Sequence, residues 1–208
     1  MKLYEFAPTR SIRARWALQE LEVPFESVPV RLLEDGAQTP EYLALNPAGK
    51  VPTLVDGDFV LTESVAIVVY LAEKYPHKGL LPTDFKQRAQ LNRWMLFVVT
   101  ELEQPLWRIA RHTFLYPEHQ RLPADIELAQ GEFRSMAAVL EKHMQGREFL
   151  IGDRVSVGDF VTAYTLDWGN EAGLLDACPR LLAYMERMYR RPKAAMRIKE
   201  AFASVAAA

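Results

Sequence analysis

The strand signals of this chain stop near residue 76, and this change of pattern limits the possible folds more than any other feature. In chain order the predicted elements before that point are a strand at 2–6, a helix at 12–21, a strand at 27–30, a helix at 41–45, strands at 53–55 and 59–61, and a helix at 64–75. Asp56-Gly57, between the last two strands, is a strong hairpin signal. The first 76 residues therefore form a β-α-β-α-β-β-α unit.

That order is typical of a thioredoxin-like domain. A stretch rich in helix breakers, Pro76 to Thr83, follows it and predicts a linker over 77–86. The remaining patterns are helical, at 85–111, 124–145, 157–172, 179–190 and 192–203. The sequence thus predicts an α+β chain: a thioredoxin-like domain at 1–76 and an all-α helical bundle domain at 87–208.

Composition excludes several classes of protein. The chain has 208 residues, of which 50% are hydrophobic, and a formal net charge of −2, so it buries a full core and has no basic surface suited to nucleic acid. Neither a basic segment leading into an apolar run nor an apolar stretch of bilayer length is present, so we expect a cytoplasmic protein without a membrane contact. The single cysteine, Cys178, excludes an internal disulfide and a Cys-x-x-Cys centre, and we expect it to be a small buried hydrophobe.

Two motifs between residues 46 and 64 point to a site for a small peptide. Val51 precedes a proline and is pushed toward extended geometry, while Pro52 lacks the N–H that continues a strand ladder. If the Val51-Pro52 bond is cis, the Val51 N–H and C=O face a cleft where an extended peptide pairs as an extra strand. Glu63 and Ser64 begin a helix, where free N–H groups attract a carboxylate and Glu63 holds an ammonium.

The stretch Asn46-Pro47-Ala48-Gly49-Lys50-Val51-Pro52 with Glu63-Ser64 resembles the glutathione transferase family, whose pattern is Asn-Pro-x-Gly-x-Val-Pro followed by Glu-Ser. The resemblance implies that the backbone at Val51 and Pro52 pairs with the cysteinyl unit of glutathione. It also implies that Glu63 and Ser64 hold the γ-glutamyl end and that Lys50 reaches the glycyl carboxylate. The alternative is that Pro52 is a turn proline and Thr62-Glu63-Ser64 a helix cap.

The loop after the first strand, Ala7 to Ser11, lies where this family keeps its thiol-activating residue. Ser11 ranks first and Thr9 second, because a hydroxyl donates a hydrogen bond to a thiolate without competing as a nucleophile. Arg10 ranks third, and it stands near the cysteine of the beta class, which argues for thiolate stabilisation over mixed-disulfide chemistry. Thr9 or Ser11 alternatively caps the next helix. Tyr4, inside the predicted strand, is a less favoured phenol donor.

A second substrate is expected against the helix at 85–111. Trp107, Arg111 and Tyr116, near its end, permit a flat, electrophilic substrate. The alternative is that this aromatic stripe is core, which is the commoner use of such a pattern. Thr100 and Glu101 match by position residues that, in some related transferases, reach glutathione on the partner subunit, and their alternative is a solvated surface.

The resemblance, together with these features, implies a homodimeric, cytoplasmic glutathione transferase that binds glutathione as co-substrate, stabilises its thiolate and conjugates it to a hydrophobic electrophile without a metal. One alternative is a glutathione-dependent isomerase or dehalogenase, although the Ser-Ser-Cys motif of zeta-type isomerases is absent at residues 8–11. Another is a non-catalytic adaptor or ligand-binding protein, because a fold alone determines no chemistry. Ser156 to Asp159 reads as a capping box that supports folding rather than chemistry.

Overall fold

The computed structural model describes residues 1–206, apart from the side chains of Leu33 and Ala206. Its contacts divide the chain into two compact units. One is Pro82–Met188, and the other joins Met1–Leu81 to the segment that begins at Tyr189. The sequence instead predicts one helical domain over 87–208, so the difference lies in the C-terminal segment, which groups with the N-terminal elements.

The first unit contains a four-stranded sheet in the order β2-β1-β3-β4. Its strands are β1 (Lys2–Glu5), β2 (Glu26–Pro29), β3 (Thr53–Asp56) and β4 (Phe59–Thr62). β1 and β2 are parallel, whereas β3 is antiparallel to both β1 and β4. Its helices include α1 (Ser11–Leu21), α2 (Pro40–Leu45) and α3 (Ser64–Lys74), with 3-10 turns at Leu32–Glu34, Gly36–Gln38 and Pro76–Lys78. The predicted β-α-β-α-β-β-α order is confirmed.

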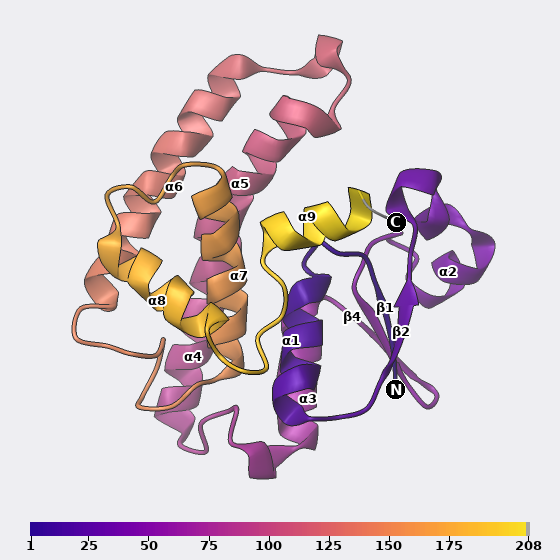
Figure 1. The fold of residues 1–208 in the computed structure, drawn as a ribbon, viewed down its shortest axis with the longest axis horizontal. Coiled ribbons are helices and arrows are strands. Elements are labelled where there is room, and N and C mark those ends of the chain that lie inside the picture. The colour runs from indigo at the N-terminus through magenta and orange to yellow at the C-terminus, as the bar shows by residue number, and fades with distance from the viewer. Residues whose placement is uncertain (207–208) are drawn as a thin grey trace. The chain divides into compact units, whose positions relative to one another are not determined.

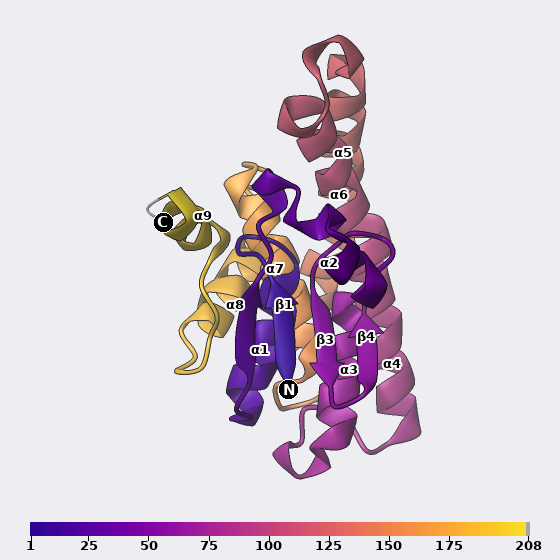
Figure 2. The same cartoon turned by 90° about the vertical axis from the view of Figure 1, so that its right-hand side faces the viewer.

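The helices of this unit cover both faces of the sheet. Figures 1 and 2 show α1 and α3 on one face and α2 on the other. The alternation of β1 follows this arrangement, because successive side chains of a strand point to opposite faces. The ring of Tyr4 meets that of Tyr42 on α2, with 5.9 Å between centroids, whereas the buried carboxylate of Glu5 binds Arg15 on α1.

The β3–β4 hairpin forms where the Asp-Gly signal predicts it. Asp56 pairs with Phe59, so the loop consists of Gly57 and Asp58. Gly57 has a φ of 67°, a left-handed conformation that glycine adopts without a steric penalty. This short loop sets the register of both strands, and through them the positions of the residues just before β3 and just after β4.

The second unit is helical. A continuous helical path consists of α4 (Phe85–Phe97), a π-helical turn (Val98–Leu102), α5 (Glu103–Ala110) and a second π-helical turn (Arg111–Leu115). A 3-10 turn (Glu118–Gln120), α6 (Pro123–His143), α7 (Val157–Glu171) and α8 (Pro179–Tyr189) follow. The predicted helices agree within a few residues, except that the first extends to Leu115, because the second π turn continues it as far as Tyr116 and Pro117.

Helix α7 is the core of this unit, and almost every residue from Val157 to Gly169 is buried. A Cβ atom at Gly169 would lie 2.4 Å from Cζ of Phe133 on α6, which shows how closely the two helices approach. The predicted capping box of Ser156 and Asp159 is present at the start of α7. Cys178, with an exposed fraction of 4%, is buried before Pro179, as expected.

The predicted helix at 192–203 begins later than expected. Helix α9 spans Ile198–Ala206, and the preceding residues, 190–197, form turns and irregular chain. Arg191 binds the carboxylate of Glu20 on α1 through Nε and Nη2, at 2.6 and 2.7 Å, and Lys193 contacts Glu22 at 3.2 Å. These contacts hold the segment against α1, where a helix would turn the two side chains in different directions. Across residues 1–206, no helix has the length and apolar character needed to span a membrane.

Candidate active site

Three predicted segments leave the sheet at the same edge. In the register of the sheet, Tyr4 of β1 lies opposite Thr53 of β3, and Thr53 lies opposite Thr62 of β4. The end of β1, the start of β3 and the end of β4 are therefore side by side, because antiparallel neighbours meet end to start. The loop after β1, the Val51-Pro52 loop and the Glu63-Ser64 pair all adjoin this edge.

The Val51-Pro52 loop offers the backbone surface that its sequence predicts. The bond between the two residues is cis. Among the described residues, neither the N–H nor the C=O of Val51 is hydrogen-bonded to another backbone group. The carbonyl of Lys50, in contrast, accepts hydrogen bonds from the Tyr42 hydroxyl and from Nδ2 of Asn46, both at 2.6 Å. The exposed ammonium of Lys50 makes no ion pair within residues 1–206.

Two side chains shape this loop: Tyr42, which sequence reasoning missed, and Asn46, which it quoted in the motif without assigning a role. The buried side chain of Asn46 also accepts a hydrogen bond from the Ala48 N–H at 3.1 Å, so it binds the loop on both sides. Burial raises the pKa of the Tyr42 phenol, which keeps it a donor to Lys50. Gly49 has a φ of 59°, and a Cβ added to it would lie 2.5 Å from Nε2 of Gln38. The Asn-Pro-x-Gly pattern contains Asn46 and Gly49, whereas Tyr42 lies outside it and has no local signal.

Glu63 and Ser64 occupy the start of α3. Glu63 is the N-cap residue, with a φ of 66° that is strained for a residue other than glycine, and its exposed side chain makes no cap hydrogen bond. Within the described chain, its carboxylate also has no ion-pair partner. Ser64, the first residue of α3, is 4% exposed, and its Oγ accepts a hydrogen bond from Nη1 of Arg13 at 3.2 Å. The side chain of Glu63 therefore does not act as the helix cap of the alternative interpretation.

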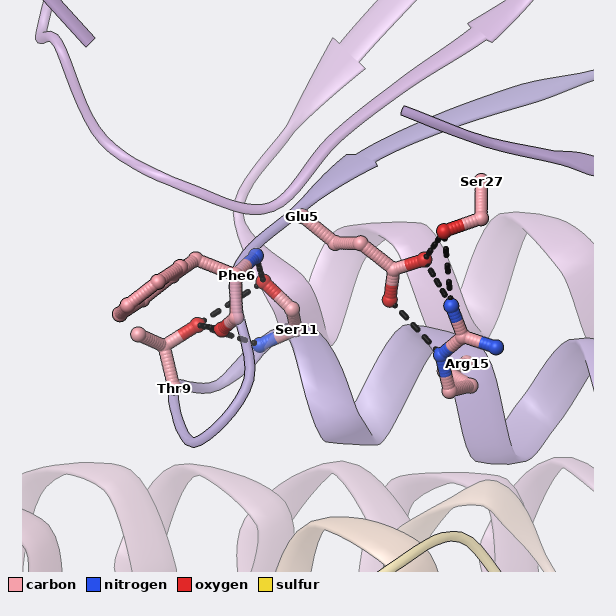
Figure 3. Close-up of polar contacts among 6 residues, drawn as sticks. All are labelled: Glu5, Phe6, Thr9, Ser11, Arg15 and Ser27. Atoms are coloured by element: carbon pink, nitrogen blue, oxygen red, sulfur yellow. Dashed lines mark hydrogen bonds and ion pairs between the residues drawn. The ribbon is translucent and has the colours of Figure 1, made fainter. Parts of the chain in front are cut away.

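Figure 3 shows the loop after β1, where Thr9 and Ser11 face each other. Their hydroxyl oxygens are 2.9 Å apart. The Thr9 hydroxyl donates to the carbonyl of Phe6, and the N–H of Phe6 donates to Oγ of Ser11 at 3.3 Å. The Ser11 N–H donates to Oγ1 of Thr9 at 3.3 Å, so the capping role foreseen for Thr9 is present in part.

The protons of this network can be assigned. A carbonyl only accepts, so the Thr9 proton lies toward Phe6, and the Ser11 proton is left to lie toward Oγ1 of Thr9. Both hydroxyl groups are therefore satisfied inside the loop. Ser11 is 1% exposed, whereas Thr9 is partly exposed, and Arg10 is the N-cap residue of α1 without a side-chain cap hydrogen bond.

Strand alternation separates Tyr4 from these residues. Its ring lies on the face that α2 covers, where it borders a shallow pocket of about 360 Å³ lined also by Val30, Arg31 and Tyr42. Ser11 and Arg13 belong to α1, on the opposite face. The phenol of Tyr4 thus points away from the first turn of α1.

In the second unit, two of the three predicted substrate residues are brought together. The guanidinium of Arg111 lies over the ring of Trp107, with 5.7 Å between Cζ and the centroid. Trp168 of α7 meets Trp107 edge to face, at 5.5 Å between centroids. Sequence reasoning missed Trp168, which lies on the otherwise buried helix α7. Tyr116 lies with another partner, the ring of His112, at 5.2 Å.

Other side chains of the 85–111 pattern follow the alternative interpretation. Trp94, Val98 and Leu102 are buried in the core, and Arg108 forms ion pairs with Asp125 and Glu132. Thr100 and Glu101 are exposed in the first π turn, and their contact with a partner subunit stays a prediction. No group of three or more His, Cys, Asp or Glu side chains suited to a metal ion occurs in the part of the chain that the structure describes.

Comparisons with known proteins give the family of this chain. Residues 1–73 match the family model of the glutathione S-transferase N-terminal domain, and residues 104–192 match that of the C-terminal domain. A zeta-class glutathione S-transferase from Euphorbia esula is 38% identical over 162 residues, covering 76% of this chain and 71% of that protein. A glutathione S-transferase from Xanthomonas campestris is 33% identical over 192 residues, covering 90% and 92%.

Solved structures with a similar fold belong to the same family. The crystal structure of a glutathione transferase homologue from Sulfitobacter, solved with bound glutathione, superimposes with a TM-score of 0.83 at 25% sequence identity, covering 93% of this chain and 94% of that one. The two family models together match most of the chain, and the solved homologue shares its fold over nearly the whole length. The chain therefore belongs to the glutathione transferase family.

Proposed function

We propose that this protein is an active glutathione transferase, which binds glutathione, stabilises its thiolate and transfers it to an electrophilic carbon. The observation that carries the proposal is the meeting of the three motif segments at one edge of the sheet, where the backbone groups of Val51 have no backbone partner among residues 1–206. The bound glutathione in the Sulfitobacter homologue supports the choice of ligand.

In this proposal each part of glutathione meets a group that suits it. The cysteinyl backbone pairs with the N–H and C=O of Val51 beside Pro52. The γ-glutamyl carboxylate binds at Ser64 and the first N–H groups of α3, and its ammonium pairs with Glu63. Lys50 pairs with the glycyl carboxylate.

For thiol activation we propose that Thr9 donates to the sulfur, with Ser11 behind it. The sequence ranks Ser11 first, but a hydroxyl that is 1% exposed is poorly placed to meet a substrate thiol. Thr9 is partly exposed, and when its proton turns from Phe6 to the sulfur, the Ser11 hydroxyl still donates to Oγ1 of Thr9. Arg10, on the same turn, adds positive charge near the anion.

The chemical step needs only the thiolate and the electrophile. The thiol proton leaves to solvent, the sulfur attacks an electron-poor carbon, and the new C–S bond forms as a leaving group departs with its electron pair. We propose that Trp107, Arg111 and Tyr116 contribute to electrophile binding, with Trp168 supporting Trp107. The aromatic faces suit a flat hydrophobic molecule, and the guanidinium suits an acidic or electron-rich substituent. We also propose that the protein is a cytoplasmic homodimer. Sedimentation equilibrium measures its mass in solution and tests the dimer.

The test is a pH titration of the ultraviolet thiolate absorbance of glutathione with saturating protein and without it. A free thiol titrates at about 8.5, and we expect the bound thiol to titrate at least about one unit lower. Binding without a lowered pKa would indicate a carrier, and absence of binding would indicate an adaptor. Either result overturns the proposal.

Variants of the loop identify the donor. T9A should raise the pKa of the bound thiol by about 1 to 2 units, because a hydrogen bond to a charged group contributes about 1.5–3 kcal/mol. T9S is the matched control, since it keeps the hydroxyl and should keep the lowered pKa. If S11A raises the pKa of the bound thiol and T9A does not, Ser11 is the donor and our assignment of Thr9 is wrong.

A further inference from the structure

Arg13 is a buried cation beside the residues proposed to bind glutathione. It is the third residue of α1, and only 1% of its surface is exposed. Arginine is rarely buried to this degree, because removing a charge from water is costly unless the charge meets suitable partners. One of its partners is the hydroxyl of Ser64, 3.2 Å from Nη1, at the start of α3.

This contact determines which way the Ser64 hydroxyl points. A guanidinium has donors and no acceptor, so Oγ of Ser64 must accept the hydrogen bond from Arg13. The hydroxyl proton of Ser64 then points away from Arg13. Within residues 1–206, Oγ of Ser64 makes no other hydrogen bond, so that proton remains ready for an acceptor.

The charges around Ser64 favour an anion as that acceptor. Ser64 is the first residue of an 11-residue helix, where unpaired N–H groups and the helix dipole present a partial positive charge. Arg13, from α1, donates to the hydroxyl of this same residue. The adjacent Glu63 is exposed and supplies a negative charge one residue away, which suits the ammonium of the same γ-glutamyl unit.

We propose that Arg13 is a positioning residue for glutathione: it holds the Ser64 hydroxyl so that its proton points at the α-carboxylate of the γ-glutamyl unit. This inference rests on the proposed function, since it names how the same site selects its ligand. Arg13 itself is not required to touch the sulfur or the electrophile.

The test compares two ligands by isothermal titration calorimetry. One is glutathione, and the other is the tripeptide in which 4-aminobutyryl replaces γ-glutamyl, which lacks only the α-carboxylate. The parent protein should bind glutathione more tightly. R13M should weaken glutathione binding by about 10- to 100-fold, the range expected for a hydrogen bond to a charged group, while binding of the second ligand stays within about twofold.

Three further variants complete the design. S64A should lose the same discrimination, and R13M/S64A should lose no more than either single variant, because both act on one contact. R13K, which keeps the charge without the fork of donors, should fall between R13M and the parent. R15M is the matched control on the same helix: it breaks the pair with Glu5 and should lower the unfolding temperature without changing the ratio of the two affinities.

The outcomes separate this inference from the proposed function. If the parent fails to bind glutathione, the proposed function fails. If the parent binds and R13M weakens both ligands equally, or neither, the role of Arg13 is overturned. Should R13M not fold, as judged by circular dichroism, S64A decides: parent-like discrimination between the ligands would overturn the inference, and its loss together with intermediate R13K would support it.

Discussion

Asp159 is the residue whose replacement should destabilise this protein most clearly. Its side chain is fully buried at the start of α7. Oδ1 accepts from the N–H of Leu150 at 2.8 Å and the hydroxyl of Tyr184 at 2.7 Å. Oδ2 accepts from the N–H and hydroxyl of Ser156 at 2.7 and 2.8 Å. Burial raises the pKa of this carboxyl, and the four donors oppose that rise.

The magnitude follows from those donors. D159A leaves two buried backbone N–H groups without an acceptor, and an orphaned buried donor costs about 1–3 kcal/mol. The two hydroxyls rotate toward other partners and add less. We therefore expect a loss of about 3–5 kcal/mol in the free energy of unfolding, as for other broken buried networks. The capping box alone, which is what the sequence shows, would contribute only about 1 kcal/mol.

Urea unfolding measures this loss, followed by tryptophan fluorescence and by far-ultraviolet circular dichroism, whose agreement justifies a two-state analysis. D159N should lose about half as much as D159A, because its remaining oxygen still accepts from Leu150 and Tyr184 while its amide nitrogen faces the Ser156 N–H. D153A is the control: Asp153 is exposed, and its replacement should change stability by less than about 0.5 kcal/mol.

A loss below about 1 kcal/mol for D159A would refute this reasoning, because it would mean that the four donors find other acceptors at little cost. Glutathione affinity gives a second check. Folded D159A should bind glutathione as the parent does, since Asp159 supports α7 and has no part in the proposed ligand contacts. Weakened binding by a fully folded variant would contradict the structural role.

Three other predictions concern stability. The Nε2–H of His143 donates to the Leu150 carbonyl at 2.9 Å, and burial lowers the pKa of this imidazole. Neutral His143 therefore stabilises the fold above its ordinary pKa of 6.5, and this stabilisation is lost as the pH falls through the folded-state pKa. Thermal unfolding of H143Q should therefore be less sensitive than the parent to a change from about pH 7.5 to about pH 5.5, and equal sensitivity would exclude His143 as the titrating group. G131A, with no heavy atom within 4 Å of the new Cβ, should stabilise α6 by about 0.5–1 kcal/mol in urea unfolding. G158A, whose Cβ would lie 2.5 Å from Cδ1 of Leu91, should destabilise by about 1–3 kcal/mol, and effects of the same sign would contradict this packing.

Local patterns were sufficient for most of the fold. Periodicity of two and of 3.6 residues identified the strands and helices of both units, and Asp56-Gly57 located the hairpin, because these signals depend on residues a few positions apart. The same holds for the motif around Val51 and for Glu63-Ser64. The start of α9 was missed because it depends on Arg191 reaching Glu20, far away in the sequence.

The arrangement of the candidate site was decided only by tertiary structure. Strand register brings the three motif segments to one edge, and no local pattern contains a register between distant strands. The burial of Ser11 behind Thr9, the contact of Arg13 with Ser64 and the meeting of Trp168 with Trp107 likewise join residues from different elements. Sequence alone therefore determined which chemical groups this protein carries, whereas packing determined which of them face each other, because the direction of a hydrogen bond and the exposure of a side chain depend on neighbours that the chain supplies from elsewhere.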